Sequence, residues 1–157
     1  MQDQFGRKIE YLRLSVTDRC NLRCRYCMPE SGVADLTHGD VLRYEEMLRV
    51  TAAACRLGIR KVRVTGGEPL VRRGIVDFIG RLASLPEKPE ITLTTNGLLL
   101  AELAEELKVA GLSRVNISLD TLRPERFEEL TRRSGLEKVL AGIEAAEVEM
   151  EGPEVEV

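Results

Sequence analysis

The sequence predicts an α/β fold, a partial TIM-like (β/α) barrel with about four βα units plus the start of a fifth strand. Short β-branched runs alternate with amphipathic stretches of helical period, and this alternation is typical of βα units in a parallel sheet. Polar residues and turn glycines follow several of the β-branched runs. A chain of 157 residues can bury a sizeable core, and one domain is expected.

Strands and helices are expected to alternate along the chain, with two successive helices before the last strand. Strands are predicted at 9–17, 61–65, 90–95 and 114–120, with a fifth strand beginning at 154–157. Helices are predicted at 44–57, 74–85, 100–110, 124–130 and 135–147. Gly58 and Gly111 fit the C-terminal stops of two of these helices, and Pro124 fits the first position of another.

Each predicted strand has one apolar side and one polar side. Parallel strands covered by helices on both faces usually read as continuous apolar runs. A polar face is therefore expected to line a bore filled by water or ligand, whereas a flat doubly wound sheet would bury it at a cost. A one-sided sheet open to water is the remaining alternative. The polar side carries Arg13, Ser15, Thr17, Arg63, Thr65, Thr92, Thr94, Asn116, Ser118 and Asp120.

Three cysteines follow the first predicted strand with the spacing C-x3-C-x2-C: Cys20, Cys24 and Cys27. A structural zinc site usually takes four ligands from two pairs of closely spaced Cys or His residues. This sequence has no second pair. Three thiolates with an open fourth position suit an iron–sulfur cubane that leaves one iron free for an outside ligand. A zinc loop completed by His38 and a disulfide framework are the alternatives.

Composition argues against several classes of partner. The net charge is −3 and the pI is about 5.4, which speaks against a nucleic-acid-binding or membrane-binding role. With no signal peptide and no membrane-spanning apolar run, a soluble cytoplasmic protein with reduced cysteines is expected. Four arginines near the cysteines are expected to favour the thiolate form; they are Arg13, Arg19, Arg23 and Arg25.

Polar turns follow the other strands as well. They read Gly66-Gly67-Glu68-Pro69, Thr94-Thr95-Asn96-Gly97 and Ser118-Leu119-Asp120. In βα barrels the ligand lies at the carboxyl ends of the strands, so these turns are expected to converge with the cysteine loop. The two glycines allow close backbone approach, and Glu68 suits a ligand ammonium group. Arg72 and Arg73 are either solvated or turned toward phosphate.

The motif from Cys20 to Cys27, with Tyr26 before the last cysteine, resembles the radical S-adenosylmethionine (SAM) superfamily, as does the GGEP turn at 66–69. Segments 14–29, 63–70, 94–99 and 116–122 are similar in order and spacing to the GTP 3′,8-cyclase (MoaA) family of molybdenum-cofactor biosynthesis. The resemblance covers about residues 13–146. It implies a radical SAM lyase that converts GTP to (8S)-3′,8-cyclo-7,8-dihydroguanosine 5′-triphosphate with a 5′-deoxyadenosyl radical.

The resemblance also implies roles for individual residues. Cys20, Cys24 and Cys27 would ligate a [4Fe–4S] cluster, whose open iron SAM would chelate, and no catalytic residue beyond the cluster is implied. The SAM contacts would come from Tyr26, Gly66, Gly67, Glu68 and Ser118. The GTP contacts would come from Arg13, Arg63 and Thr94. GTP as substrate and a reductant of the flavodoxin or ferredoxin type are the implied partners.

The sequence departs from this family in its C-terminal part. The family continues through further barrel strands to a second three-cysteine region that binds the purine, and neither is found here. We therefore expect residues 1–157 to form a truncated radical SAM core domain that is not fully active. Its last strand would leave an open edge, which raises the hypothesis of a homodimer. The alternatives are another radical SAM enzyme, such as one acting on a peptide, and a non-catalytic iron–sulfur-binding fragment.

Overall fold

A computed structural model of the chain describes residues 2–32, 40–149 and 154–156; His38 lies outside them. The strands are β1 (Tyr11–Ser15), β2 (Lys61–Thr65), β3 (Glu90–Thr95), β4 (Arg114–Ser118) and β5 (Glu154–Glu156). The helices are α1 (Tyr44–Arg56), α2 (Ile75–Ala83), α3 (Leu100–Val109), α4 (Pro124–Thr131) and α5 (Leu136–Glu149), with a short 3₁₀ helix, η1 (Pro69–Val71). No helix in these ranges is both long and apolar enough to cross a membrane.

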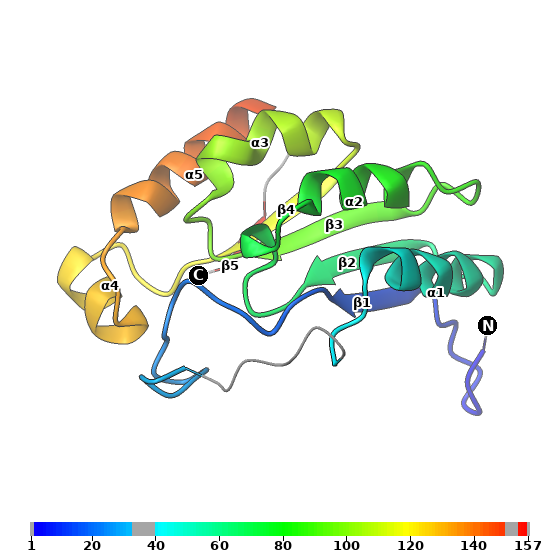
Figure 1. The fold of residues 1–157 in the computed structure, drawn as a ribbon, viewed down its shortest axis with the longest axis horizontal. Coiled ribbons are helices and arrows are strands. Elements are labelled where there is room, and N and C mark those ends of the chain that lie inside the picture. The colour runs from blue at the N-terminus through cyan, green and yellow to red at the C-terminus, as the bar shows by residue number, and fades with distance from the viewer. Residues whose placement is uncertain (1, 33–39, 150–153, 157) are drawn as a thin grey trace.

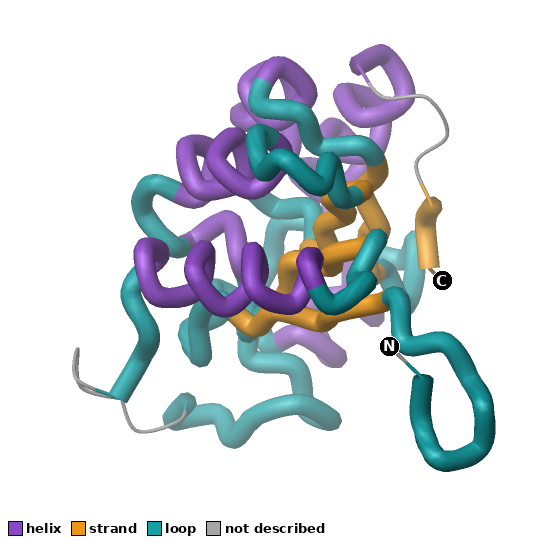
Figure 2. Tube along the Cα trace, turned by 90° about the vertical axis from the view of Figure 1, so that its right-hand side faces the viewer, coloured by secondary structure: helices purple, strands orange, loops and turns teal. Residues whose placement is uncertain are grey.

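The strands form one parallel sheet in the order of the sequence, β1-β2-β3-β4-β5 (Figure 1). Figure 2 looks along the strands and shows helices gathered on one side of the sheet. Parallel neighbours need crossover connections, and with this strand order all crossovers can follow the same hand on the same face. The predicted partial (β/α) barrel is thereby confirmed, and the doubly wound alternative is wrong because its helices would cover both faces.

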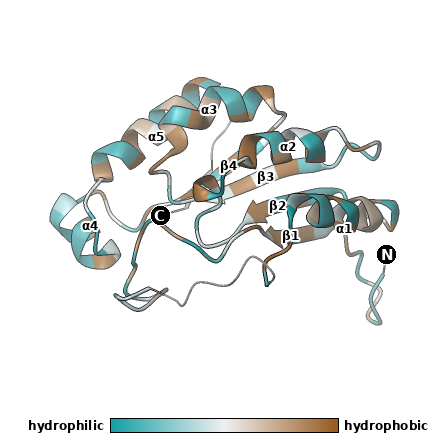
Figure 3. Ribbon diagram, in the orientation of Figure 1, coloured by the Kyte–Doolittle hydropathy of each residue, from teal (hydrophilic) through white to brown (hydrophobic). Residues whose placement is uncertain are grey.

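The core lies between the helices and the apolar face of the sheet. Val62, Val64, Ile91, Leu93 and Ile117 are fully buried, and Figure 3 shows hydrophobic residues following the strands. From the helices, Phe78, Ile79, Leu82, Leu100 and Leu107 are buried against them. Each such side chain contributes roughly 1.5–3 kcal/mol when taken out of water, so this layer fixes the strand ends that carry the polar turns.

The polar face is also as predicted. In its middle Thr92 and Asn116 are buried, while Arg13 and Ser118 are exposed. The Nε atom of Arg63 and the Oγ1 atoms of Thr92 and Thr94 are buried without a hydrogen-bond partner in the described structure. Buried polar atoms are normally hydrogen-bonded, so this face is suited to receive water or a polar ligand.

The element boundaries differ from the predictions mainly at strand ends. β1 and β4 are shorter than the predicted 9–17 and 114–120 because the chain bends away at Val16 and Leu119 into the turns of the site. The 3₁₀ helix after Glu68 was not predicted. The helix stops were predicted correctly, since Gly58 and Gly111 have φ values of 111° and 97°, a region that glycine adopts without strain.

Candidate functional site

A pocket of about 360 Å³ opens at the carboxyl ends of β1 to β4. It collects all but one of the predicted site residues, namely Arg13, Cys20, Cys24, Tyr26, Cys27, Gly66, Gly67, Glu68, Thr94 and Ser118. The exception is Arg63, which lies beside Arg13 in the register of β1 and β2. Residues that are remote in the sequence therefore converge here because the parallel strands end at one edge.

The stem of the cysteine loop, Val16–Arg19, is held against the glycine turn after β2. The N–H groups of Gly67 and Glu68 donate to the carbonyls of Thr17 and Arg19, both at 2.7 Å. A Cβ atom at Gly66 would lie 2.6 Å from the Thr17 carbonyl oxygen, and one at Gly67 would lie 2.3 Å from that of Arg19. The close approach predicted from the two glycines is thus made to the protein's own backbone.

Glu68 is a buried link between two turns. Its Oε1 atom accepts hydrogen bonds from the Leu70 N–H at 3.0 Å and the Thr95 hydroxyl at 2.8 Å. Its Oε2 atom accepts from the Asn96 N–H at 2.7 Å. Burial raises the pKa of Glu68, and these three hydrogen bonds offset part of the rise. The carboxylate therefore already joins the turns after β2 and β3, and the expected ammonium contact stays a prediction.

The thiols of the cysteine loop differ from the expectation in their acidity. Burial raises the pKa of both Cys20 and Cys24, and Arg23 lowers that of Cys20 by less. The expected effect of an arginine is present at Cys20, where Arg23 lowers the pKa, but desolvation of the charged form outweighs it. The sequence could not show this, since it does not reveal which thiols are shielded from water.

The cysteine side chains are candidate ligands. All four, including Cys55 in α1, are free thiols, so the disulfide framework is excluded. Within the described ranges, no three Cys, His, Asp or Glu side chains are close enough to hold a single metal ion, and a zinc site is not formed there. A cubane binds each thiolate at a different iron, which spreads the ligands apart. Three free thiols lining one pocket fit such a cluster.

Tyr26 and Ser118 lie at the mouth of the pocket. The Tyr26 hydroxyl donates to the Asp120 carboxylate at 2.7 Å, across 94 positions of sequence. Burial, followed by this hydrogen bond, raises the pKa of Tyr26 well above its ordinary value. The bond ties the cysteine loop to the end of β4, while Ser118 and Asp120 are exposed and accessible to a ligand.

Two arginines lie side by side on the polar face. Arg13 and Arg63 are register partners in β1 and β2, and neither forms an ion pair with another described residue. Like charges opposite each other on neighbouring strands destabilise a sheet, so this pair is a candidate binding site for an anion; the Arg63 guanidinium also lies 5.8 Å from the centroid of the Tyr11 ring. Thr94 lines the same pocket with an unpartnered hydroxyl oxygen.

The contacts of Asn96 and Arg72 were not predicted from the sequence. The Asn96 side chain donates to Asn21 Oδ1 at 2.7 Å and lies 3.9 Å from Cys20 Sγ. Arg72 is partly buried: it donates to the carbonyl oxygens of Val16 and Leu42 and lies over the ring of Tyr44 at 4.1 Å. Both support the loop from a distance in sequence, and no local pattern marks such contacts.

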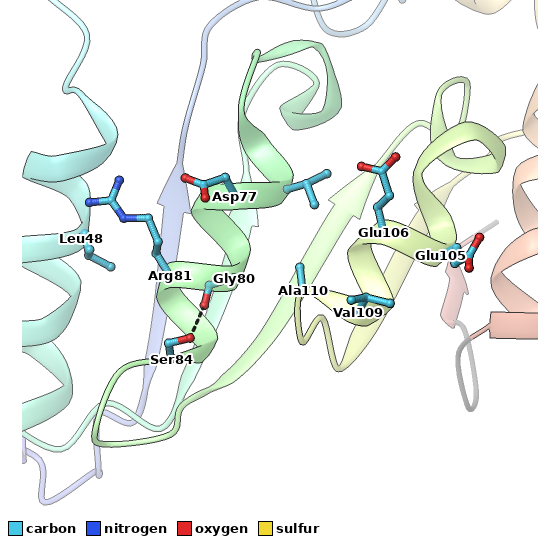
Figure 4. Close-up of a pocket in the computed structure, with 10 residues that line it drawn as sticks. Leu48, Asp77, Gly80, Arg81, Ser84, Glu105, Glu106, Val109 and Ala110 are labelled. Atoms are coloured by element: carbon cyan, nitrogen blue, oxygen red, sulfur yellow. Dashed lines mark hydrogen bonds between the residues drawn. The ribbon is translucent and has the colours of Figure 1, made fainter.

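A larger hollow of about 880 Å³ lies on the helix layer between α2 and α3 (Figure 4). Its walls include Leu48, Val76, Arg81, Glu106 and Val109. Arg81 is engaged with Glu45 at 3.1 Å. Volume alone would favour this hollow, but it holds none of the cysteines, glycine turns or unpartnered polar atoms described above. The candidate site is therefore the smaller pocket at the strand ends.

Comparison with known proteins supports the same assignment. Residues 14–150 match the Radical SAM superfamily. A GTP 3′,8-cyclase of Geobacter sulfurreducens is 58% identical over 145 residues, which cover 92% of this chain and 44% of the relative. A GTP 3′,8-cyclase of Heliobacterium modesticaldum is 60% identical over 146 residues, covering 93% and 45%. The chain thus spans somewhat under half the length of the curated relatives it matches.

Solved structures share the fold at low sequence identity. Streptococcus suis SuiB bound to S-adenosylmethionine superposes with a TM-score of 0.70 at 19% identity, covering 93% of this chain and 31% of that one. The native anSMEcpe structure with bound AdoMet gives a TM-score of 0.69 at 20% identity, covering 92% and 42%. At such identities the likeness extends to the arrangement of strands and helices alone.

Proposed function

Because the chain belongs to the radical SAM superfamily, which its residues 14–150 match, we propose that it carries the cluster-binding and SAM-binding part of a GTP 3′,8-cyclase. The observation that carries this proposal is the convergence of three free cysteines and the glycine turn in one pocket at the carboxyl ends of the strands, with Arg13 lining that pocket and Arg63 beside Arg13 in the strand register. Sequence identities of 51–60% to curated GTP 3′,8-cyclases support the choice of substrate.

Cys20, Cys24 and Cys27 would hold a [4Fe–4S] cluster. When bound, the cluster and SAM supply a 5′-deoxyadenosyl radical, and the protein supplies binding and orientation. The glycine turn, Tyr26 and Ser118 line the same pocket as the cysteines, which supports their proposed role as SAM contacts. Glu68 would act chiefly by fixing the turn, since its oxygens already accept three hydrogen bonds.

The substrate proposal depends on Arg13, Arg63 and Thr94. Guanidinium groups bind phosphate oxygens through paired hydrogen bonds, and two adjacent arginines without an acidic partner in the described structure favour a polyanion such as GTP. The unpartnered hydroxyl of Thr94 would bond the same ligand. A peptide substrate gives no comparable reason for two neighbouring uncompensated arginines. A flavodoxin-type or ferredoxin-type reductant and a homodimer belong to this proposal as well.

Anaerobic reconstitution with iron and sulfide tests the cluster. We expect about four irons per chain, a broad visible absorption and reductive cleavage of SAM to 5′-deoxyadenosine. Cys24→Ser should abolish the absorption. Cys55→Ser is the matched control, because Cys55 is 1% exposed within α1 and lies outside the pocket. Equal iron content in all three proteins would refute the cluster assignment.

Binding of GTP is tested separately in the reconstituted protein. We expect GTP to bind, and Arg13→Ala and Arg63→Ala each to weaken binding by roughly tenfold or more, since each removes a charge-assisted hydrogen bond. Arg73→Ala is the control, as Arg73 lies outside the pocket. If a peptide but not GTP accelerates SAM cleavage, another radical SAM activity replaces this one. Absence of both cluster and SAM cleavage would leave a non-catalytic fragment.

A further inference from the structure

The outer turn of the cysteine loop, Arg23–Met28, is attached to the C-terminal end of α4. The N–H of Arg23 donates to the Thr131 carbonyl, and the N–H of Arg25 donates to the Leu130 carbonyl, both at 2.9 Å. The last carbonyls of a helix have no partner within the helix. The loop supplies two of the missing donors, and α4 thereby becomes a wall of the pocket through Phe127 and Thr131.

Arg132, directly after α4, makes the second part of this attachment. Its Nη1 atom lies 2.9 Å from the carbonyl oxygen of Arg23 and 3.3 Å from that of Met28. These two carbonyls flank the segment that contains Cys24 and Cys27. One guanidinium group therefore bridges both ends of the turn that carries two of the three cysteines.

The backbone of Arg132 makes this arrangement unusual. Its φ is 54° and its N–H donates to the Glu128 carbonyl at 2.8 Å, as in a helix terminated by a left-handed residue. Glycine is the usual residue at that position because it lacks the steric penalty of a Cβ atom. An arginine in this conformation is strained, but its side chain forms the two hydrogen bonds to the carbonyls of Arg23 and Met28, which glycine could not form.

We propose that Arg132 is a positioning residue for the cluster: it fixes the turn Arg23–Met28 so that Cys24 and Cys27 keep the spacing with which they bind iron. This inference rests on the proposed cluster-binding function. Arg132 does not line the pocket, so it acts through the loop and not on SAM or substrate.

The substitution Arg132→Gly distinguishes the role of the Arg132 side chain in positioning the turn Arg23–Met28 from the role of residue 132 in ending α4. Glycine relieves the left-handed strain, so the thermal unfolding midpoint of the metal-free protein should stay the same or rise. The amides of Arg23 and Arg25 should nevertheless exchange hydrogen about three- to tenfold faster, in keeping with the loss of one or two hydrogen bonds. In the reconstituted protein, iron should pass to a chelator faster by a similar factor.

Two further variants complete the experiment. Arg133→Ala removes the same charge one residue later, from an exposed side chain that donates to the Arg132 carbonyl, and should leave exchange and iron loss within about twofold of wild type. Arg132→Lys keeps the charge without the planar fork and should lie between wild type and Arg132→Gly. If Arg132→Gly does not fold, Arg132→Lys decides the question by the same two measurements.

Wild-type exchange at Arg23 and Arg25 together with wild-type iron retention in the Arg132 variants would overturn the proposal. So would equal losses in Arg133→Ala, because charge alone would then explain them. If the wild-type chain takes up no iron, the proposed function fails and the positioning role toward a cluster fails with it. Faster exchange in the metal-free variants would then show only that Arg132 orders the turn.

Discussion

The cysteine loop is held at two places, and the two attachments differ in kind. Its stem, Val16–Arg19, meets the glycine turn backbone to backbone, with no room for even one extra carbon at Gly67. Its outer turn is held by the end of α4 and by one long side chain, Arg132. The first attachment is fixed by close packing, whereas the second is made by hydrogen bonds.

The largest expected effect breaks the stem attachment. Gly67→Ala would place a Cβ atom 2.3 Å from the Arg19 carbonyl oxygen and 2.7 Å from that of Asp18, so the backbone must move. We expect the free energy of unfolding, measured by urea denaturation, to fall by about 2–3 kcal/mol.

Gly80→Ala is the matched control for that substitution. Gly80 lies inside α2, and an added Cβ atom would meet the nearest neighbour at 3.8 Å, an ordinary contact. Alanine is the better helix former by about 1 kcal/mol, so this variant should be as stable as wild type or more stable. A similar loss of unfolding free energy in Gly67→Ala and Gly80→Ala would show that close packing at the stem does not cause the destabilisation.

A smaller effect on the free energy of unfolding is expected at Glu68, which joins the glycine turn after β2 to the turn after β3. Glu68→Gln leaves one of the three donors to the carboxylate facing an amide nitrogen, which should cost about 1–3 kcal/mol in unfolding free energy. The cost should depend on pH. Burial raises the folded-state pKa of Glu68 above 4.5, so its contribution to stability is fully present below that unfolded value and is lost as the pH rises through the folded-state pKa.

Denaturation of both proteins at pH 4 and pH 8 measures this difference. The cost of Glu68→Gln should be larger at pH 4 than at pH 8, since the other titrating groups are common to the two proteins and cancel. A cost that grows toward pH 8 would mean that the three hydrogen bonds outweigh the burial, so that the pKa of Glu68 is lowered.

The smallest effect concerns the α4 attachment. The buried Thr131 hydroxyl lies 2.8 Å from the Phe127 carbonyl oxygen, and Thr131→Val should cost about 1 kcal/mol. Thr51→Val is the control, because Thr51 makes the same kind of bond to Met47 within α1, also at 2.8 Å. Thr131→Val should lose at least as much stability as Thr51→Val, because the Thr131 hydroxyl also bonds the backbone of Arg133, but only Thr131→Val should accelerate hydrogen exchange at Arg23 and Arg25. Equal hydrogen-exchange rates at Arg23 and Arg25 in the two variants would show that Thr131 does not help to hold the cysteine loop.

The two attachments also mark what the sequence could and could not predict. The strands, the polar face and the convergence at the strand ends follow from alternation and turn glycines, and the pocket contains ten of the predicted residues together. Gly66 and Gly67 predicted a close backbone approach, but the sequence did not show that the partner is the backbone of Thr17 and Arg19. The contacts of Arg72 and Asn96 and the role of Arg132 were not predicted, because each bonds atoms that are distant in sequence. The net rise in the pKa of Cys20 and Cys24 was not predicted, because shielding from water has no local sequence pattern.

The consecutive order of the strands has a consequence for synthesis on the ribosome. Each strand pairs with the one made just before it, so the sheet can grow one βα unit at a time as the chain emerges. The bond from Arg132 to Arg23 spans 109 positions and cannot form until α4 has been made. Iron delivered to the nascent chain before that point would meet cysteines on an incompletely anchored turn, so productive loading is a late event in the life of the polypeptide.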